Sequence, residues 1–269
     1  MVEAVSAQWQ AAGFCVRGAR HVVENTPCQD ALQILESSDV VVLAVADGHG
    51  DQKHFRSAEG AQLAVQVAAQ LLEEAAKDLL YEQRTPSQIE DALKFHLPRR
   101  ISWEWNRQVK IKIGLDNDGL WHDQLVSFGT TIMAAAVTEK FGLFVQLGDG
   151  DMLLISQDGI GELVFQPDPE MYGSFTHSLC QPNNPSHARV RCLAWNRPRL
   201  FLASTDGLRD SLQGDEERYI QVGRWLIQRI DNEGWNEVLK SLPDWLAQLS
   251  AKGNGDDTTV ALLQWNKEE

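Results

Sequence analysis

The sequence predicts an α+β fold with two antiparallel β-sheets flanked by helices. Strand patterns and helix patterns are grouped along the chain, whereas a doubly wound parallel sheet would alternate them. Helical blocks at residues 57–109 and 219–249 separate an early group of strands from a strand-rich middle and from a last strand. The 269 residues, 43% of them apolar, suffice for one large domain or two small ones.

The early strands surround an unbroken apolar run. Residues 9–16 and 31–35 have short strand patterns, and Asn25 and Pro27 oppose regular pairing in the loop between them. Residues 40–46 read VVVLAVA, which is typical of a strand buried on both faces. The run ends abruptly at Asp47-Gly48-His49-Gly50-Asp51, so a carboxylate stands at the rim of the core.

The helical blocks each divide in two. Residues 57–80 place small and apolar side chains on one face, and a second helix begins with a capping box formed by Thr85 and Gln88 around Pro86. Pro98 interrupts that helix, and its spacing resumes over 101–109. In the later block, residues 219–230 and 235–249 form a pair, with Pro243 expected to kink or divide the second helix.

The middle of the chain consists of strands in quick succession. We expect strands at 130–137, 143–147, 152–156, 161–165, 188–194 and 200–204, and a final strand at 259–265. Residues 115–123 are predicted to form a polar loop. The Pro- and Asn-rich residues 166–185 are predicted to form a long loop, which is either functional or a mobile connection.

The charge balance excludes several classes of partner. Asp and Glu exceed Lys and Arg by 38 to 24, a net charge of −14, so we expect no nucleic-acid or anionic-membrane partner. The N-terminus lacks a signal-peptide pattern, and no apolar run approaches a membrane span. The four cysteines form no Cys-x-x-Cys pair and indicate reduced thiols, so we predict a cytoplasmic protein.

Acidic residues recur beside glycine at the ends of apolar runs. Asp47, Asp149, Asp206 and Asp256 have this setting, and Asp30 directly precedes a strand. Carboxylates brought together repel one another, and hard divalent ions such as Mg²⁺ or Mn²⁺ relieve the repulsion. A single Asp-Gly is usually a turn, but the repeated setting favours a metal site.

The ordered set of motifs resembles the metal-dependent serine/threonine protein phosphatases of type 2C. The resemblance rests on Gln29-Asp30, Asp47-Gly48-His49-Gly50, Ser127-Phe128-Gly129-Thr130-Thr131, Gly148-Asp149-Gly150, Ser204-Thr205-Asp206-Gly207 with Asp210, and Gly255-Asp256-Asp257-Thr258-Thr259. It implies a single domain over residues 1–269. Its fold would be a central β-sandwich of two antiparallel sheets flanked by helix pairs, in four αββα layers, with a flap-like loop at 166–185.

The resemblance also implies roles for individual residues. Asp47 resembles the aspartate that bridges two metal ions, the Gly48 carbonyl resembles a ligand of one ion, and Asp30, Asp206 and Asp256 belong to the same metal set. Asp149 and Asp210, with Asp206, resemble the site of a weaker third ion. His49 resembles the general acid that protonates the leaving alcohol, although the same position could hold a plain turn residue.

Two departures from the family pattern affect this assignment. Many members have Glu-Asp where this chain has Gln29-Asp30, so the second ion could be bound less tightly. The phosphate-binding arginine usually stands a few residues before that pair, whereas the candidates here lie farther upstream. We assign the role to Arg20, with Arg17 and His21 as alternatives.

The resemblance predicts an enzyme that hydrolyses phosphoserine and phosphothreonine in a phosphorylated protein substrate. Water activated by two Mn²⁺ or Mg²⁺ ions, with a possible third, would carry out the hydrolysis. Two alternatives remain open. One is a non-catalytic phosphoprotein-binding or scaffold module of the same fold, and the other is a hydrolase for small phosphate esters.

Overall fold

The chain folds into two compact units, each with its own antiparallel sheet. The computed structural model describes residues 2–5, 9–114, 121–168 and 176–265. Unit 1 comprises Met1–Cys28, Gly150–Gln166 and Asn196–Glu269, and unit 2 comprises Gln29–Asp149 and Pro167–Trp195. Because every strand pair is antiparallel and helices accompany both sheets, the predicted α+β class is confirmed.

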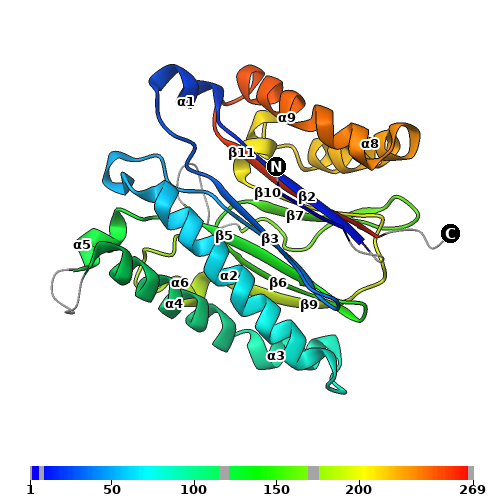
Figure 1. Cartoon of the computed structure of the whole chain (residues 1–269), viewed down its shortest axis with the longest axis horizontal. Coiled ribbons are helices and arrows are strands. Elements are labelled where there is room, and N and C mark those ends of the chain that lie inside the picture. Colours follow the sequence, from blue (N-terminus) through cyan, green and yellow to red (C-terminus); the bar gives the residue numbers. More distant parts are fainter. Residues whose placement is uncertain (1, 6–8, 115–120, 169–175, 266–269) are drawn as a thin grey trace. The chain divides into compact units, whose positions relative to one another are not determined.

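Unit 2 contains a five-stranded sheet of order β3-β4-β5-β6-β9. Its strands are β3 (Ala31–Glu36), β4 (Val41–Ala46), β5 (Ile132–Val137), β6 (Phe141–Leu147) and β9 (Arg189–Ala194). The helix α2 (Ser57–Leu80) lies across this sheet, and α4 (His96–Ile113) lies beside α2 (Figure 1). The shorter helices of the unit are η1 (Gln52–His54), α3 (Pro86–Leu93), α5 (Trp121–Val126) and α6 (Asn184–His187).

Small residues let α2 approach its sheet closely. Ala61, Ala64 and Ala68 of this helix are fully buried and belong to the same apolar core as Val42 and Ala44 of β4. Every residue of β4 is buried, as its unbroken apolar pattern predicts. The strand is therefore a rigid support for the residues that follow it.

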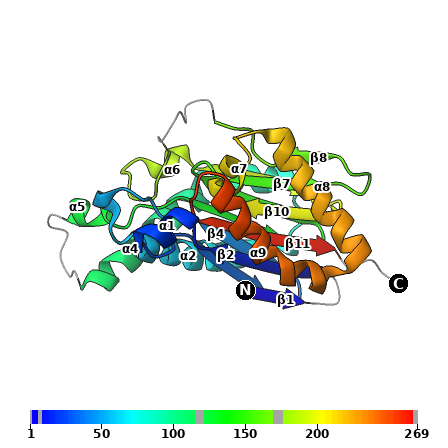
Figure 2. The same ribbon diagram turned by 90° about the horizontal axis from the view of Figure 1, so that it is seen from above.

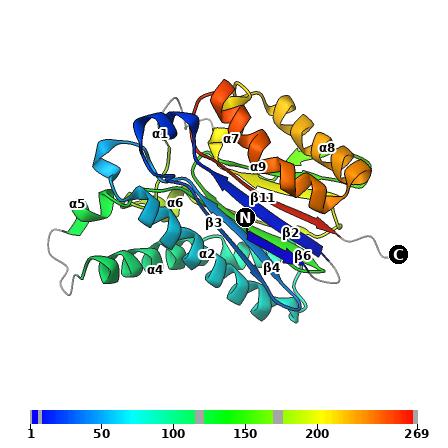
Figure 3. The ribbon, with the colours of Figure 1, turned by 45° about the horizontal axis from the view of Figure 1, so that its top comes forward.

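Unit 1 contains a six-stranded sheet of order β1-β2-β11-β10-β7-β8. Its strands are β1 (Val2–Val5), β2 (Trp9–Val16), β7 (Asp151–Ile155), β8 (Gly161–Leu163), β10 (Leu200–Ser204) and β11 (Thr258–Trp265). The helices α8 (Glu216–Glu233) and α9 (Trp235–Lys252) lie side by side, with α9 over β2 and β11 and α8 over β7 and β8 (Figures 2 and 3). Two short helices complete the unit, α1 (Ala19–Glu24) and α7 (Asp206–Ser211).

Several short elements differ from the sequence prediction. The loop after β2 contains α1, and Asn25 ends that helix in the left-handed conformation with φ of 57°. The predicted loop at 115–123 gives way to α5 at Trp121, and the loop at 166–185 gives way to α6 at Asn184; residues 115–120 and 169–175 lie outside the described residues. The strand β1 and the helix α7 were also absent from the prediction.

Neither proline divides a helix at the predicted position. Pro98 is the third residue of α4, where no helical N–H partner is needed, and the break between helices falls earlier, at Lys94 and Phe95. Pro243 lies inside α9, which continues as one helix from Trp235 to Lys252. Among the described residues, no helix is long and apolar enough to cross a membrane.

Candidate functional site

Three predicted metal ligands lie along one edge of the unit 2 sheet. Asp30 directly precedes β3 and Asp47 directly follows β4, and the neighbouring residues Ala31 and Ala46 are register partners. Asp149 follows β6, whose last residue Leu147 pairs with Ile132 at the start of β5. Antiparallel pairing thus brings residues that are far apart in sequence to the same edge.

Two threonines fix the backbone of Asp47. The amide of Thr131 and the hydroxyl of Thr130 each donate to the Asp47 carbonyl at 2.8 Å. The Asp47 amide in turn donates to Thr131 Oγ1 at 3.0 Å. These bonds give the Thr130-Thr131 motif the role of holding the backbone of Asp47 in place.

Gly48 is packed so tightly that no side chain fits there. A Cβ on this residue would lie 2.6 Å from the Gln29 carbonyl oxygen and 2.8 Å from the backbone of Ser57. The Gln29 amide group donates to Ser57 Oγ at 2.7 Å and to the His49 carbonyl at 3.2 Å. Gln29 therefore braces the turn after β4, a role that the sequence analysis did not assign to it.

His49 packs against a second histidine. Its ring centroid lies 4.8 Å from that of His54, and its amide donates to the Gly129 carbonyl at 3.1 Å. A Cβ on Gly129 would lie 2.4 Å from His54 Nδ1 and 2.8 Å from His49 Cδ2, so the glycine of this motif makes room for both rings. Burial, followed by the charges of His54 and Lys53, lowers the pKa of His49 to about 4.

The low pKa of His49 affects its predicted role as a general acid. At pH 7 the imidazole of the unliganded protein is neutral, so it does not hold the proton that a general acid delivers. A phosphate monoester beside the ring would add negative charge, which favours the protonated imidazole.

A second acidic edge occurs in unit 1. Asp206 follows β10 and is the first residue of α7, and Asp256 lies just before β11, the strand that pairs with β10. Thr205 and Thr259 join the two segments through reciprocal bonds of 3.1 and 3.0 Å. A Cβ on Gly207 would lie 1.9 Å from the Asp257 carbonyl oxygen, so this glycine is needed where α7 passes the start of β11.

The adjacent acids Asp256 and Asp257 have different environments. Asp257 is buried, and its Oδ1 accepts from the Gly18 amide at 2.7 Å and lies 2.8 Å from His21 Nδ1. The side chain of Asp256 is 39% exposed and pairs with Arg20 at 2.9 Å. Of the two carboxylates, only that of Asp256 is accessible from solvent.

The three candidates for binding phosphate differ in their contacts and in their exposure to solvent. Arg17 donates to the His21 carbonyl at 2.8 Å, and His21 directs Nδ1 and Nε2 towards Asp257 and Asp256. The side chain of Arg20 is 51% exposed. Arg20 therefore has the most accessible cationic group of the three, whereas His21 braces the acidic pair.

The negative charges of Asp210 and Asp256 in unit 1 suit the binding of a cation. Although Asp210 is an exposed residue, partial desolvation and the negative charge of Asp256 raise the pKa of its carboxyl, against the opposing effect of Arg209. A divalent ion with oxygen ligands would relieve this repulsion. Over the described ranges, no group of three or more His, Cys, Asp or Glu side chains could hold a metal ion.

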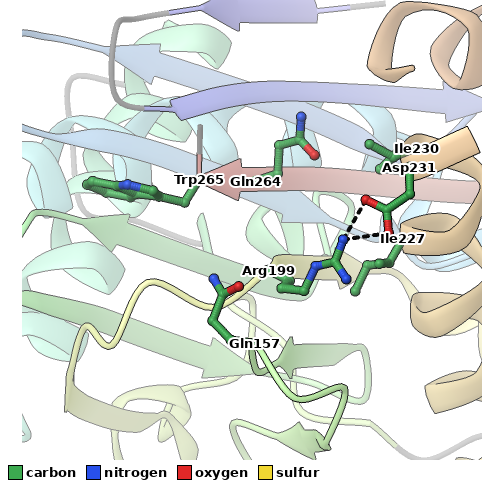
Figure 4. A pocket seen from close by; sticks show the side chains of 7 residues that line it. All are labelled: Gln157, Arg199, Ile227, Ile230, Asp231, Gln264 and Trp265. Atoms are coloured by element: carbon green, nitrogen blue, oxygen red, sulfur yellow. Dashed lines mark hydrogen bonds and ion pairs between the residues drawn. The ribbon is translucent and has the colours of Figure 1, made fainter. Parts of the chain in front are cut away.

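A cavity of about 330 Å³ in unit 1 is lined by none of the predicted site residues. Figure 4 shows Arg199 and Asp231 pointing towards each other, with contacts of 2.5 and 2.6 Å. The remaining lining residues are Gln157, Ile227, Ile230, Gln264 and Trp265. This cavity is therefore separate from the acidic edge of its own unit.

Comparison with solved structures identifies the fold. The chain resembles RsbX in complex with magnesium (14% identity, TM-score 0.55, covering 98% of this chain and 99% of that one). It resembles the serine-threonine phosphatase 2C from Toxoplasma gondii (15% identity, TM-score 0.63, 98% and 97% coverage). It also resembles the catalytic domain of the serine threonine protein phosphatase PstP with two manganese ions (17% identity, TM-score 0.51, 97% and 99% coverage).

At these identities the structural likeness shows a shared fold. No curated protein matches the sequence. A family profile for protein phosphatase 2C matches residues 17–247, a span that contains every predicted site residue except Asp256. Because this match covers most of the chain, the chain belongs to the protein phosphatase 2C family.

Proposed function

We propose that the chain is a metal-dependent protein phosphatase that hydrolyses phosphoserine and phosphothreonine monoesters. The observation that carries this proposal is the position of the motif carboxylates. Asp47 directly follows the buried strand β4, Asp206 stands two residues beyond the buried strand β10, and threonine hydrogen bonds fix the backbone at or beside each of them. Membership of the protein phosphatase 2C family supports the reaction type.

We propose Mn²⁺ or Mg²⁺ as the cofactor, with two ions bound and a possible third. The structures of RsbX with magnesium and of PstP with two manganese ions support this choice of metals. Following the family resemblance, the ligands would be the carboxylates of Asp30, Asp47, Asp206 and Asp256 and the Gly48 carbonyl. Asp149 and Asp210 would serve a third ion. When bound, such ions act as Lewis acids that lower the pKa of water and neutralise phosphoryl charge.

The chain's own side chains would bind and orient the substrate. Arg20 has an accessible guanidinium, which suits bidentate binding of a phosphate. His49 would donate a proton to the departing serine or threonine oxygen once the charge of the phosphate has raised its pKa. His54 and Gly129 hold the His49 ring in place through the contacts described above.

The proposal includes a partner and a location. A phosphorylated protein is the proposed substrate, in keeping with the family. The proposed location is the cytoplasm, which follows from the cysteine pattern of the sequence.

A substrate panel tests the proposed activity. With Mn²⁺ present, we expect the chain to hydrolyse a phosphothreonine peptide with a higher kcat/KM than p-nitrophenyl phosphate. Hydrolysis of the small ester alone would favour the small-ester hydrolase. Peptide binding without hydrolysis of either compound would favour the scaffold module. Arg20→Ala should raise KM for the peptide, whereas Arg100→Ala, which removes an exposed arginine of α4, should not.

A further inference from the structure

Two thiols of unit 1 lie in direct contact. Cys15 Sγ in β2 is 3.3 Å from Cys28 Sγ, which stands four residues beyond the end of α1. Cys15 is exposed and Cys28 is partly exposed, whereas the other two cysteines, Cys180 and Cys192, are buried. The pair is therefore accessible to small reagents in solution.

The distance between the two sulfurs favours a disulfide over a shared zinc ion. Thiolates that share a tetrahedral zinc ion lie about 3.8 Å apart, given a Zn–S bond of about 2.3 Å. The distance of 3.3 Å in this pair is shorter. A disulfide requires about 2.05 Å, which the two side chains can reach by moving towards each other by roughly 1.3 Å.

We propose that Cys15 and Cys28 are a site of reversible oxidation, at which a hydroperoxide converts the two thiols into a disulfide. The Cys15 thiolate attacks one peroxide oxygen, the O–O bond breaks, and a sulfenic acid forms with release of water. The Cys28 thiolate then attacks the sulfenic sulfur, the S–O bond breaks, and a second water leaves. In sum, two thiols and one hydrogen peroxide give one disulfide and two waters.

The surroundings of Cys15 support its role as the attacking group. The contact with Cys28 is the largest cause that lowers the pKa of the Cys15 thiol, and this effect together with the nearby Thr259 side chain outweighs partial burial and the charge of Asp257. By contrast, burial raises the pKa of Cys192 to about 12. Because the thiolate is the nucleophile, an oxidant in limited supply should select Cys15.

A disulfide between Cys15 and Cys28 would constrain the segment between them, which contacts the acidic pair Asp256 and Asp257. Cys15 and Cys28 are 13 positions apart, and the residues between them include α1 with Arg20 and His21. These two residues hold Asp256 and Asp257 through the contacts at 2.9 and 2.8 Å. Oxidation would therefore restrict the segment that braces the acidic pair of unit 1, whatever reaction the chain carries out.

Peroxide titration of the whole chain tests the proposal. After treatment with a small excess of hydrogen peroxide and alkylation, non-reducing peptide mapping should show Cys15 joined to Cys28 in one chain. Cys180 and Cys192 should remain reduced. The melting temperature should rise by about 5 °C or more, since closing a loop of this length restricts the unfolded chain. Dithiothreitol should reverse both changes.

Matched variants make the result decisive. In Cys28→Ser, peroxide should leave Cys15 as a sulfenic or sulfinic acid, without the cross-link and without the rise in melting temperature. Cys192→Ala removes a buried thiol and should keep the cross-link. The proposal is overturned if both thiols of the wild-type chain stay open to alkylation. It is equally overturned if Cys15 proceeds to sulfinic acid while Cys28 stays reduced, or if the cross-linked chain melts no higher.

Discussion

At the scale of single residues, neighbouring acids differ in role because their surroundings differ. Asp257 is buried against His21 and the Gly18 amide, whereas the side chain of Asp256 is 39% exposed and paired with an exposed arginine. A buried carboxylate with charge-assisted bonds stabilises the fold, whereas an exposed ion pair contributes little.

Asparagine substitutions should separate these two roles. Asp257→Asn should lower the free energy of unfolding by about 1–3 kcal/mol, because it weakens the bonds to His21 and to the Gly18 amide. Asp256→Asn should lower it by less than about 1 kcal/mol, because its ion pair is exposed. Urea denaturation of both variants provides the comparison. Equal losses in the two variants would contradict the assignment of Asp257 to the structure.

His54 should make the stability of the protein depend on pH. Burial, the largest cause, lowers the pKa of His54 below its usual value of 6.5, and the ring Nδ1 bonds to the Val126 carbonyl. The unfolded chain therefore binds the proton more readily, so the free energy of unfolding should fall as the pH drops below about 6.5. The decline should be smaller in His54→Gln.

Urea denaturation at pH 7.5 and pH 5.5 measures this effect. His96 lies on the exposed surface at the start of α4, so His96→Gln serves as the control and should keep the wild-type pH dependence. An unchanged pH dependence in His54→Gln would show that the buried ring does not contribute.

Some residue roles were accessible to sequence reasoning and others were not. The repeated Asp-Gly setting singled out Asp47, Asp206 and Asp256 because it recurs at strand ends. No local pattern marks His21, whose carboxylate partner Asp257 is 236 positions away. Gln29 was considered as a departure at the metal site, whereas its amide group bonds to Ser57 and to the His49 carbonyl.

At the scale of elements, α2 packs closely against the loop before β5. Gly60 of α2 faces the backbone of Phe128, where a Cβ would lie 1.9 Å from the carbonyl oxygen. The indole of Trp105 in α4 donates to the Gly60 carbonyl at 3.0 Å. This one glycine therefore determines how closely α2 approaches the loop that carries Gly129.

The substitution Gly60→Ala should destabilise the protein although alanine favours helices. Helix propensity alone would stabilise the variant by roughly 1 kcal/mol. The clash is with backbone that cannot rotate away, so we expect a net loss of about 1–3 kcal/mol in the free energy of unfolding.

Gly223→Ala provides the matched control for the clash at Gly60. Gly223 lies inside α8, and its added Cβ would meet the terminal methyl group of Leu153 at 2.8 Å. Because the end of a side chain can shift, Gly223→Ala should lower the free energy of unfolding clearly less than Gly60→Ala does. Thermal or urea unfolding of the two variants provides the comparison. A gain in stability for Gly60→Ala would contradict the backbone contact.

Long periodic elements were predictable, and short ones were not. The spacing of apolar residues over 57–80 predicted the observed limits of α2, and the capping box predicted where α3 begins. The helices α1 and α7 have six residues each, fewer than two turns, so no periodicity distinguishes them from turns. Pro243 does not divide α9, in which Leu239, Leu242 and Leu246 are buried on both sides of the proline, and the predicted kink stays a prediction.

At the scale of the whole molecule, each unit is assembled from segments that are distant in sequence. Unit 1 combines three segments, and its strand β2 pairs with β11 near the other end of the chain. Grouping of elements predicted two antiparallel sheets, but the strand order depends on long-range pairing that no local pattern encodes. Only the resemblance to a family could supply that order in advance.

The central claim is that Asp47, Asp206 and Asp256 bind the divalent ions that the reaction needs. The most direct test is the Mn²⁺ activation curve of phosphothreonine-peptide hydrolysis for the wild-type chain and for Asp206→Asn. We predict no wild-type activity in chelator, recovery on addition of Mn²⁺, and a kcat at least about 100-fold lower in the variant at saturating metal. Activity that survives chelation, or an unchanged kcat in Asp206→Asn, would contradict the claim.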